Sequence, residues 1–167
     1  MASAAAVDDA AGTLRTPPRT RRERQRLRTR ERLYQLAVAE FRRVGVARAR
    51  VRDIVDAAGV VPGTFYFHFP TRDHVLLELF RRNAARVVAR LPHGATGVPR
   101  FLRALGDAMI DVEVEVADPL LVRASVAVAL RPPPGIVAAP DPIEAALRAR
   151  LEQAHARGRL PGELAPA

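Results

Sequence analysis

The chain has 167 residues, contains no cysteine, and carries a formal net charge of +9. The lack of cysteine excludes a disulfide framework, a thiolate metal site and a cysteine nucleophile. The sequence has no apolar run long enough to cross a bilayer, and its N-terminus lacks the basic stretch of a secretory signal. We therefore expect a cytoplasmic protein without a membrane partner.

The positive charge is confined to the first half of the chain. Residues 1–90 hold 19 arginines against 9 acidic residues, whereas residues 91–167 hold 8 arginines against 9 acidic residues. A genome rich in G and C would explain the use of arginine instead of lysine, but it would not explain this asymmetry. A basic half joined to a near-neutral half indicates a module that binds a polyanion, followed by a part with another task.

Three helices are predicted early in the chain, after an N-terminal arm. Residues 1–22 lack apolar periodicity, and we expect a disordered basic arm there. Apolar residues at three- and four-residue spacing predict a helix over 23–44 and a shorter helix over 51–58, which Gly59 ends. A third helix is predicted over 62–69, because its first residue is proline, which is favoured at that position.

Four more helices are predicted in the rest of the chain. Thr71 is a suitable N-cap for a helix that ends near residue 90. Helical spacing continues over 101–116 and 119–130, and after the break RPPPG a last helix covers 141–157. Residues 111–118 alternate like a strand, but they extend a longer helical stripe and have no partner strand. The sequence therefore predicts an all-α fold.

A basic helix followed by two short helices with a glycine in the turn is typical of a helix-turn-helix, here at about residues 50–69. Residues 23–87 would form the DNA-binding domain, and residues 95–160 would form a C-terminal helical regulatory domain. Phe65 and Phe69 lie four residues apart and point the same way, so we predict that both belong to the core.

A long sequence motif coincides with this helix-turn-helix. The segment AGVVPGTFYFHF spans residues 58–69, RDI at 52–54 precedes it, and an arginine follows it at position 72. Together with the end of the first helix at Phe41 to Gly45, these residues resemble the N-terminal domain of the TetR family of regulators, over about residues 25–85. The resemblance implies a DNA-binding transcriptional regulator, most often a ligand-responsive repressor that works as a dimer.

The resemblance also implies DNA contacts. Arg52 would face a base edge or a phosphate in the major groove, and Arg72 would hold a phosphate. Small residues at the start of the recognition helix would let the backbone approach the DNA, and the aromatic residues after them would touch phosphate, sugar or a thymine methyl. The implied contact residues are Arg50, Arg52, Pro62, Gly63, Thr64, Tyr66, Phe67, His68 and Arg72.

Two positions depart from the family pattern. Arg50 and Val61 stand where the family often has a serine or threonine that caps the next helix. Losing such a cap costs about 1 kcal/mol. Arg50 would instead offer a phosphate contact.

Three of these interpretations have structural alternatives. Tyr66 would simply pack on the first helix, and His68 would be a partly buried histidine without a DNA contact. The arginine-rich run at residues 19–32 would be a solvated helix face.

In the family, the C-terminal helices form an effector pocket and a dimer interface. The candidates for lining such a pocket are Phe101, Leu105, Met109, Val112 and Leu121, and the alternative for each is an ordinary core position. The chain ends where family members usually continue with a helix pair that forms the dimer. We therefore expect either a truncated chain or a homodimer that forms in another way.

The sequence shows no catalytic arrangement. The four histidines are scattered, and neither a glycine-rich phosphate loop nor a nucleophile elbow occurs. Asp107, Asp111 and Glu115 share one helix face, where they would form acid–base pairs, bind a cationic effector or, as we prefer, face solvent and salt-bridge partners. We expect no enzyme, no cofactor and no metal site.

The sequence thus predicts a sequence-specific regulator whose partners are double-stranded DNA and a small-molecule effector. One alternative is a truncated or degenerate relative that acts as a protein-interaction partner without binding DNA by itself. Another is a basic protein that binds nucleic acid without sequence preference.

Overall fold

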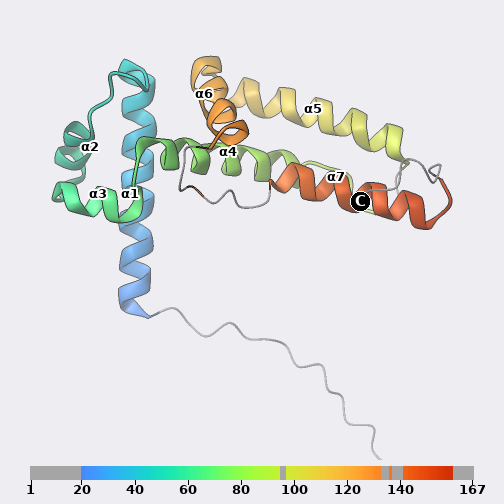
Figure 1. Cartoon of the computed structure of the whole chain (residues 1–167), viewed down its shortest axis with the longest axis horizontal. Coiled ribbons are helices and arrows are strands. Elements are labelled where there is room, and N and C mark those ends of the chain that lie inside the picture. Colours follow the sequence, from blue (N-terminus) through green and yellow to red (C-terminus); the bar gives the residue numbers. More distant parts are fainter. Residues whose placement is uncertain (1–19, 95–96, 133–135, 137–140, 160–167) are drawn as a thin grey trace, which may run out of the picture.

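The computed structural model describes residues 20–94, 97–132, 136 and 141–159, and in these ranges it contains seven helices and no strand (Figure 1). The predicted all-α fold is confirmed, and the segment that alternates like a strand is helical up to Val116. The expected arm falls outside the described residues, except for its last three. The helices are α1 (Arg21–Val44), α2 (Val51–Ala58), α3 (Pro62–His68), α4 (Arg72–Ala89), α5 (Val98–Val116), α6 (Pro119–Leu130) and α7 (Pro142–Ala156).

Helix α1 begins two residues earlier than its apolar stripe suggests, because a capping box precedes the stripe. The Oγ1 of Thr20 accepts a hydrogen bond from the N–H of Glu23 at 3.2 Å. The Glu23 carboxylate in turn accepts one from the N–H of Thr20 at 2.7 Å. This reciprocal pair satisfies two N–H groups that would otherwise lack partners. The described part of the arginine-rich run is therefore an exposed helical surface.

The turn between α2 and α3 depends on Gly59. Its φ of 63° and ψ of 39° lie in the left-handed region, where a residue with a Cβ is disfavoured by roughly 1–2 kcal/mol. The next N–H, that of Val60, donates to the carbonyl of Val55 at 3.1 Å. These features end α2 and turn the chain back, so that α3 packs against α2.

The first hydrophobic core joins α1, α2, α3 and the start of α4. Phe65 and Phe69 are fully buried in it, which confirms that they are core residues. Helix α6 also enters this core through Leu121, with Ala124 and Val128 packed beside it. The core of the N-terminal half is therefore completed by a helix from the C-terminal half.

The second core lies between the end of α4 and helices α5 and α7. It contains Val87, Phe101 and Val112, and Ile143 and Leu147 of α7 pack against it. Helix α4 packs against α5, α6 and α7, and Figure 1 shows it running from the helix-turn-helix into this layer. Because α4 contributes to both cores, a change in one half is mechanically connected to the other.

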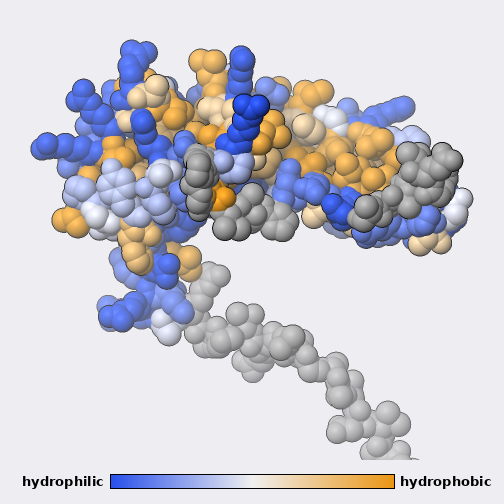
Figure 2. All heavy atoms as spheres, viewed as in Figure 1, coloured by the Kyte–Doolittle hydropathy of each residue, from blue (hydrophilic) through white to orange (hydrophobic). Residues whose placement is uncertain are grey.

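Surface polarity differs between the two ends of the molecule. Figure 2 shows hydrophilic side chains along the N-terminal half of α1 and apolar side chains over α5 and α6. Leu102, Ile110 and Val114 of α5 are among the exposed apolar residues. Within the described ranges, no helix is both long and apolar enough to cross a membrane.

Candidate nucleic-acid interface

Helix α3 combines a buried face with an exposed face. The rings of Phe65 and Phe69 are buried with their centroids 5.9 Å apart, and they fix the helix to the first core. The opposite face exposes 69% of Val61, 50% of Tyr66 and 66% of Phe67. Large apolar side chains this exposed on a seven-residue helix are available to a partner.

The other residues predicted on α3 lie around this exposed face. Pro62 and Gly63 are exposed at its start, whereas Thr64 and His68 are partly buried. Burial, followed by the nearby charges of Arg26 and Arg30, lowers the pKa of His68 below its ordinary value. The lowered pKa favours the neutral form of the His68 imidazole.

Two exposed residues of this surface are absent from the contacts that the sequence implied. Val61 is one of them, and its position before Pro62 gave no sign of its exposure. The other is Arg26 of α1, whose guanidinium lies 5.1 Å from the centroid of the Phe67 ring. Arg26 lies in the arginine-rich run, but only the tertiary structure shows that this particular arginine adjoins α3.

The two arginines at the start of α2 are both exposed. Arg52 forms only a long ion pair with Asp56, at 3.7 Å, so its guanidinium remains accessible. Arg50 precedes α2 without a side-chain cap, and Val61 precedes α3 in the same way. The two departures from the family pattern therefore leave both helix starts without a capping side chain, as expected from the sequence.

Arg72 makes contacts that the sequence did not indicate. Its Nη1 donates to the carbonyls of Val46, Ala47 and Ala49, at 2.8, 3.2 and 3.1 Å. The guanidinium thereby ties the start of α4 to the loop that leads into α2. These bonds do not test the expected phosphate contact, but they show that Arg72 positions the loop before Arg50.

A network of charged side chains joins α1, the end of α3 and α4. Arg30 donates to a Glu78 carboxylate oxygen at 2.8 Å, and its guanidinium lies 4.4 Å from the centroid of the Phe69 ring. Arg82 donates to Glu78 at 2.9 Å and to both oxygens of Glu31 at 2.8 and 2.6 Å. The Arg82 hydrogen bonds lower the pKa of Glu31 to about 2. The network fixes the angle at which α4 leaves the helix-turn-helix.

A second candidate site is a cavity of about 170 Å³ between α4, α5, α6 and α7. Met109 and Val112, two of the five predicted pocket residues, line it together with Ala84 of α4 and Val126 of α6. The other three residues do not line this cavity. Phe101 is buried in the second core, Leu105 packs against that core, and Leu121 is buried in the first core.

The acidic face of α5 contains one residue with clear partners. Glu115 accepts hydrogen bonds from Arg86 and from Arg90, the latter at 2.6 Å. Asp107 and Asp111 are exposed. The contacts of Glu115 with the two arginines agree with our preferred interpretation, in which this helix face forms salt bridges. Among the described residues, no group of three histidines or acidic residues is placed to hold a metal ion.

The sequence from the second half of α1 to the first half of α4 matches a known family. Residues 33–79 match the family described as "Bacterial regulatory proteins, tetR family". Over these residues the chain resembles the helix-turn-helix domain of TetR-family regulators. Helices α2 and α3 lie wholly within the matched residues.

Two curated repressors are similar to a part of this chain. A "Probable acrEF/envCD operon repressor" of Escherichia coli K12 is 35% identical over 60 residues, which are 36% of this chain and 27% of that protein. The "HTH-type transcriptional repressor KstR2" of Mycobacterium tuberculosis H37Rv is 41% identical over 49 residues, which are 29% of this chain and 24% of the relative. These matches cover about a quarter of each relative.

One solved structure aligns over more of the chain. Salmonella enterica GusR has 20% sequence identity and a TM-score of 0.48, and the alignment covers 82% of this chain and 73% of GusR.

Proposed function

We propose that this protein is a sequence-specific repressor of transcription that reads duplex DNA through α3. The observation that carries the proposal is the two-sided character of this helix. Phe65 and Phe69 hold it rigidly to the core, while Val61, Tyr66 and Phe67 stay exposed beside the accessible Arg52. A recognition helix needs this combination, because base readout requires a fixed orientation in the major groove.

The chemistry of the exposed residues suggests their roles. Arg52 suits the O6 and N7 acceptors of guanine, and Val61 and Phe67 suit a thymine methyl group. Arg50 and Arg26 would contact phosphates. Arg72 would also contact a phosphate, through the guanidinium N–H groups that do not bond to the carbonyls of residues 46–49. Pro62 and Gly63 lack long side chains and would let the α3 backbone approach the DNA, where Thr64, Tyr66 and His68 would supply polar contacts.

Selection of bound duplexes from a random pool tests the proposal, with solution mass measured on the same sample. We expect a related set of recovered sequences and a log–log salt dependence whose slope reflects several phosphate contacts. Arg52→Ala should relax the preference at one position, and Phe65→Ala should abolish selection by unfolding α3. Recovery of unrelated duplexes would favour a basic protein without sequence preference.

We also propose that the active form is a homodimer. One recognition helix contacts too little DNA for tight specific binding, and regulators of this kind read two half-sites about one helical turn apart. The exposed Leu102, Ile110 and Val114 of α5 offer apolar surface for such an association. A monomer that fails to shift duplex DNA at low salt would instead favour the interaction-partner alternative.

The cavity between α4 and α7 is our candidate for a small-molecule effector site. Its walls are mainly apolar, and Met109 and Val112 line it beside the polar Asn83 and Glu113. A ligand held there would push on α4 and shift its population between two orientations of the recognition helix. Val126→Trp would fill the cavity and should abolish the response to any effector, while the DNA affinity without effector is retained.

A further inference from the structure

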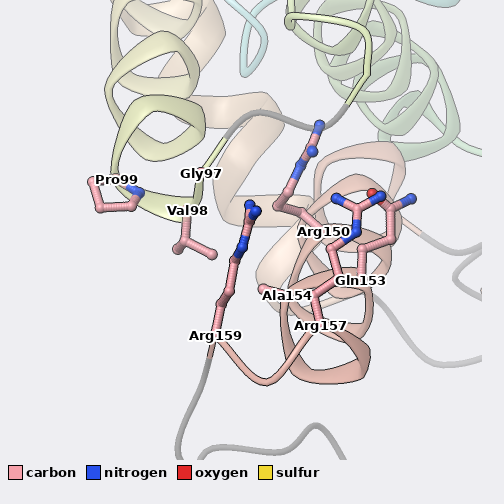
Figure 3. A pocket seen from close by; sticks show the side chains of 8 residues that line it. All are labelled: Gly97, Val98, Pro99, Arg150, Gln153, Ala154, Arg157 and Arg159. Atoms are coloured by element: carbon pink, nitrogen blue, oxygen red, sulfur yellow. The ribbon is translucent and has the colours of Figure 1, made fainter.

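A second hollow lies at the end of the molecule that is remote from α3 (Figures 1 and 3). It has a volume of about 150 Å³ and lies between the start of α5 and the end of α7. Three arginines, Arg150, Arg157 and Arg159, line it together with Gln153 and Val98. It shares no lining residue with the cavity between α4 and α7.

Arg150 forms the fixed wall of this hollow. Its side chain is almost fully buried, and it donates to the carbonyl of Gly94 at 2.7 Å. Its guanidinium also lies 4.9 Å from the centroid of the Phe101 ring. These contacts hold one positive charge in place and tie Gly94 to α7.

Arg157 and Arg159 add two further charges that have no acidic partner among the described residues. Figure 3 shows the side chain of Arg159 between Val98 and α7. The guanidinium groups of Arg157 and Arg159 lie at the same hollow, and a bound anion would reduce the repulsion between them. None of the described residues that line the hollow has a carboxylate.

The start of α5 increases the positive potential. Its N-cap, Gly97, has no side chain to accept hydrogen bonds from the first turn, and that turn contains no acidic residue. The N-terminus of a helix carries about half a positive charge. The arginines and this helix end therefore act on the same small volume.

We propose that this hollow binds a small oxyanion, a phosphate or a carboxylate group, as a site separate from both the recognition helix and the α4–α7 cavity. The planar forks of Arg157 and Arg159 match the paired oxygens of such groups. Gln153 adds an amide donor, and the volume exceeds that of a few waters, so one oxyanion fits without rearrangement of the walls.

Calorimetric titration of the full chain with inorganic phosphate and, separately, with succinate tests the site. Ionic strength is held constant with chloride. We expect saturable binding of one anion per chain, and the tighter of the two ligands identifies whether the site prefers phosphate or carboxylate. Absence of saturable binding by both ligands would overturn the proposal.

A charge-matched pair of double variants separates this site from the general basicity of the protein. Arg157→Gln with Arg159→Gln should weaken binding about tenfold or more, because it removes charge-assisted hydrogen bonds. The control, Arg103→Gln with Arg123→Gln, removes two exposed charges outside the hollow and should bind as the native chain does. Equal affinities of the two double variants would refute the assignment.

Gly97→Asp gives a test that does not depend on losing side chains. The φ of Gly97 is negative, and an added Cβ would meet no atom closer than 3.9 Å, so aspartate fits there. Its carboxylate would cap α5 and occupy the anion position. We expect a higher Tm and no phosphate binding, whereas native-like phosphate binding by this variant would contradict the proposal. Neither titration uses DNA, so the outcome is independent of the proposed repressor function.

Discussion

Phe65 and Phe67 are two residues apart on α3 and have opposite surroundings. The first is fully buried in the core beneath α1, and the second is two-thirds exposed, with Arg26 stacked over its ring. Helical geometry separates them by more than half a turn, so one aromatic residue anchors the helix while the other faces outward. Stability and the proposed DNA contact can therefore be altered separately on this helix.

Substitution of these two residues should separate the two properties. Phe65→Ala should lower the free energy of unfolding by about 3–5 kcal/mol, because it leaves a cavity in the core. Phe67→Ala should lower it by no more than about 1 kcal/mol, the value of a surface cation–π contact, while weakening DNA binding. Urea unfolding and duplex titration measure the two effects. A large loss of stability in Phe67→Ala would contradict the assignment of an exposed contact residue.

Arg72 illustrates how a residue can serve the interface indirectly. Arg72→Ala removes three hydrogen bonds to the loop of residues 46–49. It should lower the free energy of unfolding by about 1–3 kcal/mol. Amide hydrogen exchange in that loop should accelerate, whereas in the control Arg52→Ala it should stay unchanged. If Arg72 also holds a phosphate, the salt slope of DNA binding should fall by about one unit. Loop exchange at the native rate would rule out the positioning role.

At the scale of helices, the junction between α1 and α4 depends on a chain of ion pairs. Arg82 bridges Glu31 of α1 and Glu78 of its own helix, and its guanidinium covers the ring of Tyr34 at 3.9 Å. Exposed pairs contribute little singly, but a shared network that spans two helices restrains their relative angle. That angle decides where the recognition helix stands relative to the C-terminal half.

The junction should weaken in acid. The folded-state pKa of Glu31 is about 2, below its ordinary 4.5, so its contribution is present above pH 4.5 and is lost as the pH falls toward 2. The difference in urea midpoint between the native chain and Glu31→Gln should be largest near pH 6. It should shrink as the pH falls from 4.5 toward 2. Glu144→Gln, which removes an exposed pair with Arg148, is the control and should show a smaller difference. A difference that does not change with pH would exclude this role of Glu31.

At the scale of the whole molecule, α6 joins the two halves. It supplies Leu121 to the first core, while Val122 packs against the second core and lines the candidate effector cavity. A backbone acceptor of α5 adds to this connection, since Arg42 of α1 donates to the carbonyl of Val116 at 3.4 Å. The DNA-binding and C-terminal halves therefore share one structural framework.

Truncating Leu121 should accordingly destabilise the DNA-binding half, although the residue lies in the C-terminal half of the sequence. Leu121→Ala should lower the free energy of unfolding by about 2–5 kcal/mol and increase hydrogen exchange in α1 and α4. The control, Leu120→Ala, removes a neighbouring side chain that is 78% exposed. It should leave the free energy of unfolding and the hydrogen exchange in α1 and α4 unchanged. Exchange that increases only in α5 and α7 would show that the two halves are uncoupled.

The sequence by itself determined the helices and the two sides of the recognition helix. Apolar spacing, proline at the start of α3 and glycine at its preceding turn are local signals, so α2 and α3 were predicted within one residue of their observed bounds. The division between buried Phe65 and Phe69 and their neighbours also follows from helical periodicity alone. The TetR resemblance rests on the same local residues, which is why the family comparison confirms it.

Only the tertiary structure decided which distant residues meet. Leu121 packs in the first core, and Arg72 hydrogen-bonds to a loop 23–26 residues away; the sequence indicated neither of these partners. Likewise, the contact between Arg26 and Phe67 and the convergence of three arginines on the start of α5 cannot be read from spacing. The physical reason is that periodicity reports which face of a helix is buried, whereas helix crossing and side-chain packing decide what that face touches.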